Sequence, residues 1–221
     1  MIENSAARPS AAWFKRILFA FAALALVTLG FLAFIGFFGN FREVSPGKYY
    51  RSEQLKPQGF KDAITAHGIK SVLNLRGEQS NAEWYKGEVA VCASEKIDHM
   101  DINIGLGALP KPETLQRLVE KLEAGPYPML VHCRSGSDRS GLAGAFYLNI
   151  VEKKPLAEAE ADQVSWRFGH FAIGRAQSIN AFFQLYHDTS KGQSLKEWLY
   201  QTYPAEYARM ATAQTKSRTN D

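Results

Sequence analysis

The sequence has only two cysteines, Cys92 and Cys133, among its 221 residues. Two cysteines cannot build a disulfide framework, and no cluster of cysteine and histidine has the spacing of a zinc site. A strong excess of one charge is also missing, because 26 lysines and arginines stand against 22 acidic residues. This balance lacks the clustered basic footprint of nucleic-acid-binding proteins. We therefore expect neither a metal site nor a nucleic-acid partner.

Charged residues are absent from 17–38, a stretch interrupted only by Thr28 and two glycines. As a helix this stretch is long enough to cross a hydrocarbon core of about 30 Å. A cleaved signal peptide is disfavoured, since its apolar region usually has about 7 to 15 residues and ends at an Ala-x-Ala site. A buried helix of a soluble protein is the third interpretation. It is disfavoured because the apolar residues here lie on all sides of the helix and not along one stripe. We predict an N-terminal tail over 1–16 and one transmembrane helix over 17–39.

Beyond this stretch, apolar strand patterns alternate with helical ones, which is typical of parallel β-α units with a site at the carboxyl ends of the strands. We predict an α/β fold with a central, mostly parallel sheet flanked by helices over 44–200, followed by a polar tail over 201–221. The predicted strands cover 48–52, 71–77, 96–104 and 129–131. The predicted helices cover 57–68, 81–93, 111–125, 142–148, 155–170 and 178–187.

The most informative motif is His-Cys-Arg-Ser-Gly-Ser-Asp-Arg-Ser-Gly, which runs from His132 to Gly141 between an apolar strand and a helical pattern. Backbone N–H groups in such a turn converge on an anion, and the following helix adds the positive end of its dipole. The same field should lower the pKa of Cys133, and Arg139 can offer two N–H donors to phosphate oxygens. The alternative is an inert buried cysteine with a surface arginine.

This motif resembles the His-Cys-x5-Arg-Ser-Gly signature of the cysteine-dependent protein tyrosine and dual-specificity phosphatases. The order Tyr-Arg-Ser, helix, Gly-Ile-Lys-Ser-Val-Leu-Asn-Leu-Arg is similar to the atypical branch found in bacteria, fungi and plants, and the resemblance extends over 49–186. It implies a phosphatase-like α/β fold and a phosphomonoester hydrolase that needs no metal or cofactor. The Cys133 thiolate would attack phosphorus, and water would hydrolyse the resulting cysteinyl-phosphate.

The resemblance also assigns the surrounding residues. Ser140 would help the thiolate leave in the second step, with a helix N-cap as its alternative role. His132 would orient the loop by hydrogen bonding. The residues expected to hold the phosphate are Arg134, Ser135, Gly136, Ser137, Asp138 and Arg139.

The general acid is the point at which the sequence departs from the family. The loop before the signature, Gly105 to Pro110, contains no acidic residue. Two candidates remain, Asp101 on the preceding strand and Asp138 beside the signature arginine. Asp138 resembles the arrangement in myotubularin-like lipid phosphatases and some bacterial tyrosine phosphatases, and it could protonate the leaving oxygen. We favour Asp138, while a role in bracing the loop remains its alternative.

Three functions follow from these observations. The first is a membrane-anchored protein tyrosine or dual-specificity phosphatase, whose partner is a phosphorylated protein. The second is a phosphatase of the same mechanism that acts on a phospholipid or glycolipid headgroup, for which Arg134 would supply an additional cation. The third is a catalytically weak phosphate-binding module. Arg51 and Arg76 are expected either to approach the mouth of the pocket or to form surface ion pairs. The sequence does not determine the oligomeric state.

Basic residues lie on both sides of the apolar stretch, so the positive-inside rule leaves both orientations open. Lys15 and Arg16 directly precede the stretch and favour an N-terminus inside the cell. We expect a single-pass protein of the bacterial inner membrane with its catalytic domain outside the cytoplasm.

Overall fold

The computed structural model describes residues 11–37 and 39–219, which divide into two units with a boundary between Phe38 and Gly39. The first unit contains one helix, α1 (Ala11–Phe37), whose central window Trp13–Gly30 is long and apolar enough to cross a membrane. The helix begins before the predicted residue 17. Residues 1–10 of the predicted tail and residue 38 of the predicted span lie outside the described residues.

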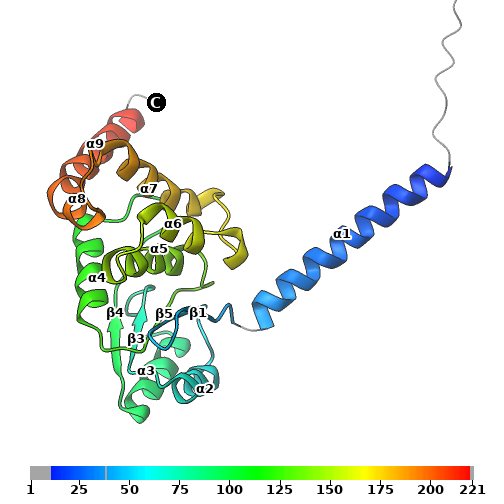
Figure 1. Cartoon of the computed structure of the whole chain (residues 1–221), viewed down its shortest axis with the longest axis horizontal. Helices are drawn as coiled ribbons and strands as arrows, with labels where there is room; N and C mark the ends of the chain where they lie inside the picture. Colours follow the sequence, from blue (N-terminus) through cyan, green and yellow to red (C-terminus); the bar gives the residue numbers. More distant parts are fainter. Residues whose placement is uncertain (1–10, 38, 220–221) are drawn as a thin grey trace, which may run out of the picture. The chain divides into compact units, whose positions relative to one another are not determined.

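The second unit is built on a five-stranded sheet in the order β1-β2-β5-β3-β4 (Figure 1). Its strands are β1 (Arg42–Ser45), β2 (Tyr49–Ser52), β3 (Ser71–Asn74), β4 (Asp98–Asp101) and β5 (Met129–His132). Only the edge pair β1 and β2 is antiparallel, and the other three pairs are parallel. The predicted mostly parallel α/β sheet is confirmed. The edge strand β1, which follows the apolar helix, was not predicted.

Helices cover both faces of this sheet (Figure 1). The smaller apolar cluster packs residues of α2, such as Phe60 and Ile64, against the sheet. The larger cluster joins α4, α5, α7 and α8 to the other face. The helix bounds are α2 (Pro57–His67), α3 (Glu83–Glu95), α4 (Pro112–Ala124), α5 (Asp138–Phe146), the π-helical turn η1 (Tyr147–Val151), α6 (Leu156–Gln163), the 3₁₀ turns η2 (Trp166–Phe168) and η3 (Gly174–Ala176), α7 (Gln177–Thr189), α8 (Leu195–Gln201) and α9 (Tyr203–Thr219).

Two segments differ from the prediction. The helix expected over 155–170 ends at Gln163, and the chain continues through a short 3₁₀ turn. Within this segment Gly169 has a positive φ of 77°, a conformation that favours glycine and interrupts a helix. The expected tail over 201–221 contains α9, and Tyr203 at its start is fully buried. The domain therefore extends beyond residue 200.

Three parallel strands end at the same level and thereby position the site. In the register of the sheet, Ser52 of β2 and Asn74 of β3 both lie opposite His132 of β5. Cys133 follows His132 directly, so the nucleophile candidate leaves the sheet between two flanking strand ends. The sequence predicts this placement, since sites of parallel sheets lie at the carboxyl ends of their strands.

Candidate active site

The loop between β5 and α5 turns the carbonyl groups of residues 134–137 outward. The carbonyl of Arg134 accepts from the backbone N–H of Gln54 at 3.4 Å, and that of Ser135 accepts from Nδ2 of Asn40 at 3.0 Å. The carbonyls of Gly136 and Ser137 accept from Nη2 of Arg51 at 2.7 and 2.8 Å. Four consecutive carbonyls are thus held from outside the loop. The N–H groups of the same peptides face the opposite way, which makes a concave anion site.

Gly136 is required where this loop packs against the end of β2. Its φ is +69°, and a Cβ atom placed there would lie 2.6 Å from the backbone nitrogen of Glu53 and 2.7 Å from the carbonyl carbon of Ser52. Backbone atoms cannot move aside as a flexible side chain can. The loop can therefore approach the strand only because residue 136 has no side chain.

Arg51 is a central brace of the loop. Its side chain is fully buried, and besides the two loop carbonyls its Nη1 donates to the backbone oxygen and to Oε1 of Gln163 at 2.8 and 2.9 Å. Its guanidinium also lies 4.4 Å from the ring centre of Phe168. Neither role expected for Arg51 from the sequence, at the pocket mouth or in a surface ion pair, is observed. The sequence shows only an arginine in a strand, and the fold decides what this arginine reaches.

Cys133 lies at the base of the loop and is almost fully buried. Burial acts to raise the pKa of its thiol, but the charge of Arg139 and hydrogen bonds from the hydroxyl and backbone of Ser140 and the backbone of Ser135 outweigh it, so the pKa is lowered. The other cysteine, Cys92, is buried without such neighbours, and its pKa rises to about 12. The lowered pKa of Cys133 therefore suits a nucleophile, whereas the raised pKa of Cys92 suits an unreactive core residue.

Ser140 and Arg139 both lie beside Cys133. The Ser140 hydroxyl contacts the Cys133 sulfur and lies 3.5 Å from the carbonyl oxygen of Ser52, while the residue that precedes α5 as its N-cap is Ser137. The N-cap alternative for Ser140 is thus not observed. Nη1 of Arg139 donates to the carbonyl oxygen of Leu75 at 3.4 Å, whereas its buried Nε has no partner among the described residues. A phosphate oxygen would satisfy this donor.

Two further arginines carry positive charge near Arg139. Burial, and then the charges of Arg139 and Arg134, lower the pKa of Arg76. The guanidinium of Arg76 lies 3.6 Å from the ring centre of Trp84, and its Nη1 donates to Oε1 of Gln54 at 3.1 Å. Arg134 is exposed. The site therefore carries two positive charges in addition to that of Arg139, the residue expected to clamp the phosphate.

His132 is held from behind by a carboxylate that the sequence analysis did not single out. Oε1 of Glu88 lies 2.9 Å from Nε2 of His132 and 2.8 Å from Nε2 of His99, and Oε2 of Glu88 accepts from Nε2 of Gln54 at 2.7 Å. Burial acts to raise the pKa of Glu88, but the hydrogen bonds from His132 and His99 lower it to about 2. Glu88 thus fixes the His132 ring through Nε2, whereas the buried Nδ1 has no partner among the described residues, so the expected hydrogen bond from His132 to the loop is not observed.

Asp138 has a partner that the sequence did not reveal. Its Oδ1 lies 2.7 Å from Nδ1 of His170, and Nε2 of the same ring lies 2.7 Å from Oδ1 of Asn180. Burial acts to lower the pKa of His170, but its hydrogen bonds to the side-chain oxygens of Asp138 and Asn180 outweigh burial and raise the pKa. His170 was expected inside a helix. A histidine that closely follows a glycine in a connecting segment was the only available signal.

Asp101, the other acid candidate, lies further from the signature. It is opposite Asn74 in the sheet, and Asn74 is opposite His132, so two strand spacings of about 4.8 Å separate Asp101 from His132. Its Oδ1 accepts from Nδ2 of Asn74 at 2.8 Å, and its Oδ2 accepts from the Tyr85 hydroxyl at 2.5 Å. Both carboxylate oxygens are thus engaged, one by the neighbouring strand β3 and the other by helix α3.

The loop Gly105–Pro110, where the family places its acid, is fixed to the start of α7. The carbonyl of Leu106 accepts from Nε and Nη2 of Arg175 at 3.1 and 2.9 Å. The N–H of Gly107 donates to the Arg175 carbonyl at 3.0 Å and to the Ser178 hydroxyl at 3.2 Å. These bonds hold a loop that carries no acid, so a proton donor has to come from elsewhere.

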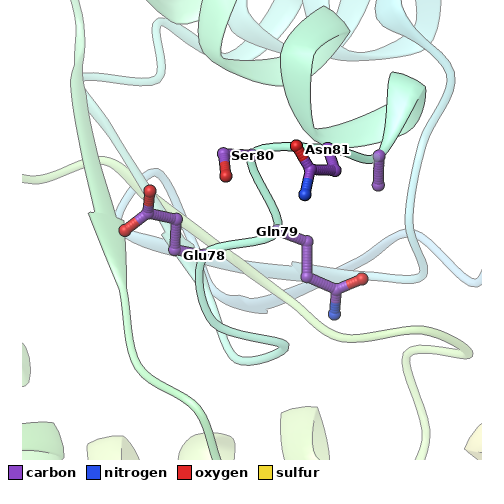
Figure 2. Close-up of a pocket in the computed structure, with 5 residues that line it drawn as sticks. Glu78, Gln79, Ser80 and Asn81 are labelled. Atoms are coloured by element: carbon purple, nitrogen blue, oxygen red, sulfur yellow. The ribbon is translucent and has the colours of Figure 1, made fainter.

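An open hollow of about 580 Å³ lies along the loop that follows β3. Figure 2 shows its lining residues, with Glu78 and Gln79 projecting to opposite sides of the loop. The described lining residues, Glu78 to Ala82, include one carboxylate and no basic side chain. This hollow is therefore chemically distinct from the arginine-rich loop.

Comparison with known families identifies the class of protein. Residues 39–183 match the sequence model of PTP-SAK, described as the Swiss Army Knife protein, DSP-PTPase phosphatase domain. Because the match covers more than half of the chain, this chain belongs to that phosphatase-domain family. The predicted membership of the cysteine-dependent tyrosine and dual-specificity phosphatases is confirmed. Among curated protein sequences no match was found.

Solved structures of the same fold include three that illustrate its range. The catalytic domain of the PP-IP phosphatase SIW14 from S. cerevisiae is 20% identical with a TM-score of 0.51, covering 71% of this chain and 94% of that one. A phosphatase of unassigned function from Shewanella putrefaciens is 18% identical with a TM-score of 0.53, covering 68% and 89%. P. aeruginosa TpbA, as a cysteine-to-serine variant in complex with phosphotyrosine, is 18% identical with a TM-score of 0.50, covering 70% and 92%.

Proposed function

We propose that this chain is a membrane-anchored phosphomonoester hydrolase that works through a cysteinyl-phosphate and acts on phosphorylated protein side chains, above all phosphotyrosine. The observation that carries the proposal is the loop from Arg134 to Ser137, whose carbonyls are all bound from outside while a low-pKa thiol lies at its base. Such a loop serves to hold an oxyanion against a nucleophile.

In the first step the Cys133 thiolate attacks phosphorus, an S–P bond forms and the bond to the leaving oxygen breaks. Asp138 gives that oxygen a proton, and the charge on the non-bridging oxygens is held by Arg139 and the loop N–H groups. In the second step water attacks phosphorus and passes its proton to Asp138, the S–P bond breaks, and inorganic phosphate is released. Ser140 donates to the departing thiolate. The His170 imidazole keeps the Asp138 carboxylate oriented toward the loop.

Phosphotyrosine is favoured as the substrate because the nucleophile is nearly fully buried, and a long aromatic phosphoester reaches such a sulfur more easily than a short one. The phosphotyrosine complex of TpbA, which has the same fold, supports this assignment. A lipid phosphomonoester is the second candidate. It is supported by the positive charges of Arg76 and Arg134 beside Arg139, which suit a substrate with several anionic groups.

The anchor is proposed from the length and apolar composition of α1. It would keep the catalytic domain at the surface of a membrane, and the basic residues Lys15 and Arg16 in the N-terminal part of α1 favour a domain outside the cytoplasm.

The test uses the full chain reconstituted in lipid nanodiscs. Wild type should hydrolyse para-nitrophenyl phosphate and be inhibited by vanadate, Cys133→Ser should be inactive, and Cys92→Ser should retain activity as the matched control. Equal inactivity of wild type and Cys133→Ser, with phosphate bound by both, would identify a binding module instead. Tyrosine-phosphorylated peptides should then be turned over faster than phosphatidylinositol phosphates. The reverse order would select the lipid candidate.

A further inference from the structure

The segment between α6 and α7 exposes large apolar side chains. The exposed fraction is 61% for Trp166, 52% for Phe171 and 75% for Ile173. Outside α1, the described residues contain one other large apolar side chain of comparable exposure, Tyr200. We call residues 166–173 the rim segment. Apolar side chains gathered in eight consecutive residues mark an interaction surface more often than scattered ones do.

The rim segment is joined to the catalytic loop by several direct contacts. Nδ2 of Asn40 donates to the carbonyl oxygen of Phe168 at 2.9 Å and to that of Ser135 at 3.0 Å. Within the same segment His170 contacts Asp138, and the Phe168 ring lies over the Arg51 guanidinium. The rim segment and the phosphate-binding loop therefore form one hydrogen-bonded assembly.

Few residues separate this assembly from the apolar helix along the chain. The helix α1 ends at Phe37, and Asn40 follows three residues later. Three extended residues span at most about 10 Å. If α1 crosses a bilayer, Asn40 and the Phe168 carbonyl that it binds cannot lie far from the membrane surface.

The charge of the segment fits the same location. Residues 164–176 contain two arginines, Arg167 and Arg175, and no aspartate or glutamate. Both arginines are exposed. Aromatic rings together with basic side chains are typical of protein surfaces that lie in the headgroup region, where the rings enter the acyl boundary and the cations meet anionic lipid.

We propose that the rim segment is a second membrane contact, in which Phe171, Ile173 and Trp166 enter the headgroup region of the leaflet from which α1 emerges. The inference rests on the membrane anchor of the proposed function. The anchor alone would tether the domain at a single point. The second contact fixes the phosphate-binding loop at the bilayer surface, so that phosphates close to the membrane are within its reach.

The test places a photoreactive benzoylphenylalanine in the full chain at one of three exposed aromatic positions, Phe19 in α1, Phe171 in the rim segment and Tyr200 in α8. Each variant is reconstituted in nanodiscs that contain anionic lipid, irradiated, and analysed by mass spectrometry for lipid adducts. Turnover of para-nitrophenyl phosphate confirms that each variant is folded. If the Phe171 variant is inactive, Ile173 supplies a second rim position.

We expect lipid adducts at Phe19 and Phe171 and several-fold fewer at Tyr200. Adducts at Phe19 alone would overturn the second contact and leave the anchor intact. The absence of adducts at both positions would overturn the anchor together with the inference. Protein adducts at Phe171 in place of lipid adducts would show that a second copy of the chain covers the rim segment, which also overturns it.

Discussion

The imidazole of His170 lies between two oxygens, with Nδ1 at 2.7 Å from Oδ1 of Asp138 and Nε2 at 2.7 Å from Oδ1 of Asn180. Both ring nitrogens can donate only when the imidazole is protonated, which agrees with the raised pKa of His170. A protonated imidazole donates to the Asp138 carboxylate and thereby holds it beside the loop. The segment Gly105–Pro110 contains no acidic residue, so Asp138 with its His170 partner is the proposed source of the proton.

The first prediction concerns the proton donor. Asp138→Asn should lower kcat for phenyl phosphate, a poor leaving group, by about 100-fold, because general acid catalysis contributes at least that much. The loss should be smaller for para-nitrophenyl phosphate, whose leaving group needs less protonation. Steady-state kinetics over a range of pH should also show that the decline of kcat at high pH disappears.

Asp101→Asn is the control for this prediction, because its carboxylate is already engaged by Asn74 and Tyr85. It should keep the wild-type pH profile. If Asp101→Asn removed the high-pH decline and Asp138→Asn did not, the roles of the two residues would be reversed.

The second prediction concerns the thiol. The pKa of Cys133 is lowered below its usual value near 9.0, so iodoacetate should inactivate the enzyme at a rate that is already at half its maximum below that pH. Arg139→Ala should move the midpoint to higher pH, because the largest lowering contribution comes from the arginine charge. Alkylation of Cys92, whose pKa is about 12, should be negligible in the same experiment. An unshifted midpoint in Arg139→Ala would contradict this assignment.

The third prediction concerns the buried brace. Arg51→Met keeps most of the side-chain volume but removes the donor to the carbonyl of Gly136 and to both acceptor oxygens of Gln163. The Ser137 carbonyl retains the Gly141 N–H. The free energy of unfolding should fall by about 3 to 5 kcal/mol, as when one partner of a buried charged contact is removed. Urea denaturation measures the loss.

Arg175→Met provides the comparison, since Arg175 also binds a loop carbonyl but is exposed. Its cost should be about 1 kcal/mol or less. Equal costs for the two variants would show that the burial of Arg51 has no energetic role.

The fourth prediction concerns stability in acid. The pKa of Glu88 is lowered from 4.5 to about 2 in the folded chain, so its contribution is present above pH 4.5 and is lost as the pH falls toward 2. His99, whose pKa is raised, is protonated in both states throughout this range and adds no slope. The wild-type free energy of unfolding should drop by about 3 kcal/mol over the interval.

Glu88→Gln should be less stable at neutral pH and nearly flat over the same interval. Glu83→Gln, an exposed residue of the same helix, should follow the wild-type curve. Denaturation at several pH values checks both, and an unchanged slope in Glu88→Gln would contradict the prediction.

The fifth prediction concerns the glycine of the loop. Gly136→Ala introduces a Cβ atom against the backbone of Ser52 and Glu53, so the loop must move and its N–H groups diverge. Phosphate and vanadate affinity should fall at least about 10-fold, corresponding to 1.4 kcal/mol.

Gly68→Ala is the control, because Gly68 has a similar positive φ of 59° but no atom within 4 Å of its Cβ position. It should lower only stability, by about 1 kcal/mol, without an effect on binding. If both variants lost affinity to the same extent, the cause would be the unfavourable positive φ and not the contact of the Cβ atom with Ser52 and Glu53.

The sequence by itself determined the features that depend on neighbouring residues. Spacing and chemistry within His132 to Gly141 located the candidate nucleophile, the candidate phosphate clamp and the proposed anion-binding turn, because one strand-turn-helix unit supplies all of them. The alternation of apolar strands with helical patterns determined the parallel sheet, and the charge-free stretch before it predicted α1. Each of these features is visible in residues that are close together in the sequence, so it can be predicted without knowing which distant residues are in contact.

Only the tertiary structure decided which distant groups complete the site. Arg51 lies 85 positions from Gly136, Glu88 lies 44 from His132 and His170 lies 32 from Asp138. Each is a common residue in an ordinary segment, and its role comes from the layering of helices on the sheet. Electrostatic and steric effects act through space, so the lowered pKa of Cys133, the partner of Asp138 and the rim segment beside the loop could be read only once the chain was folded.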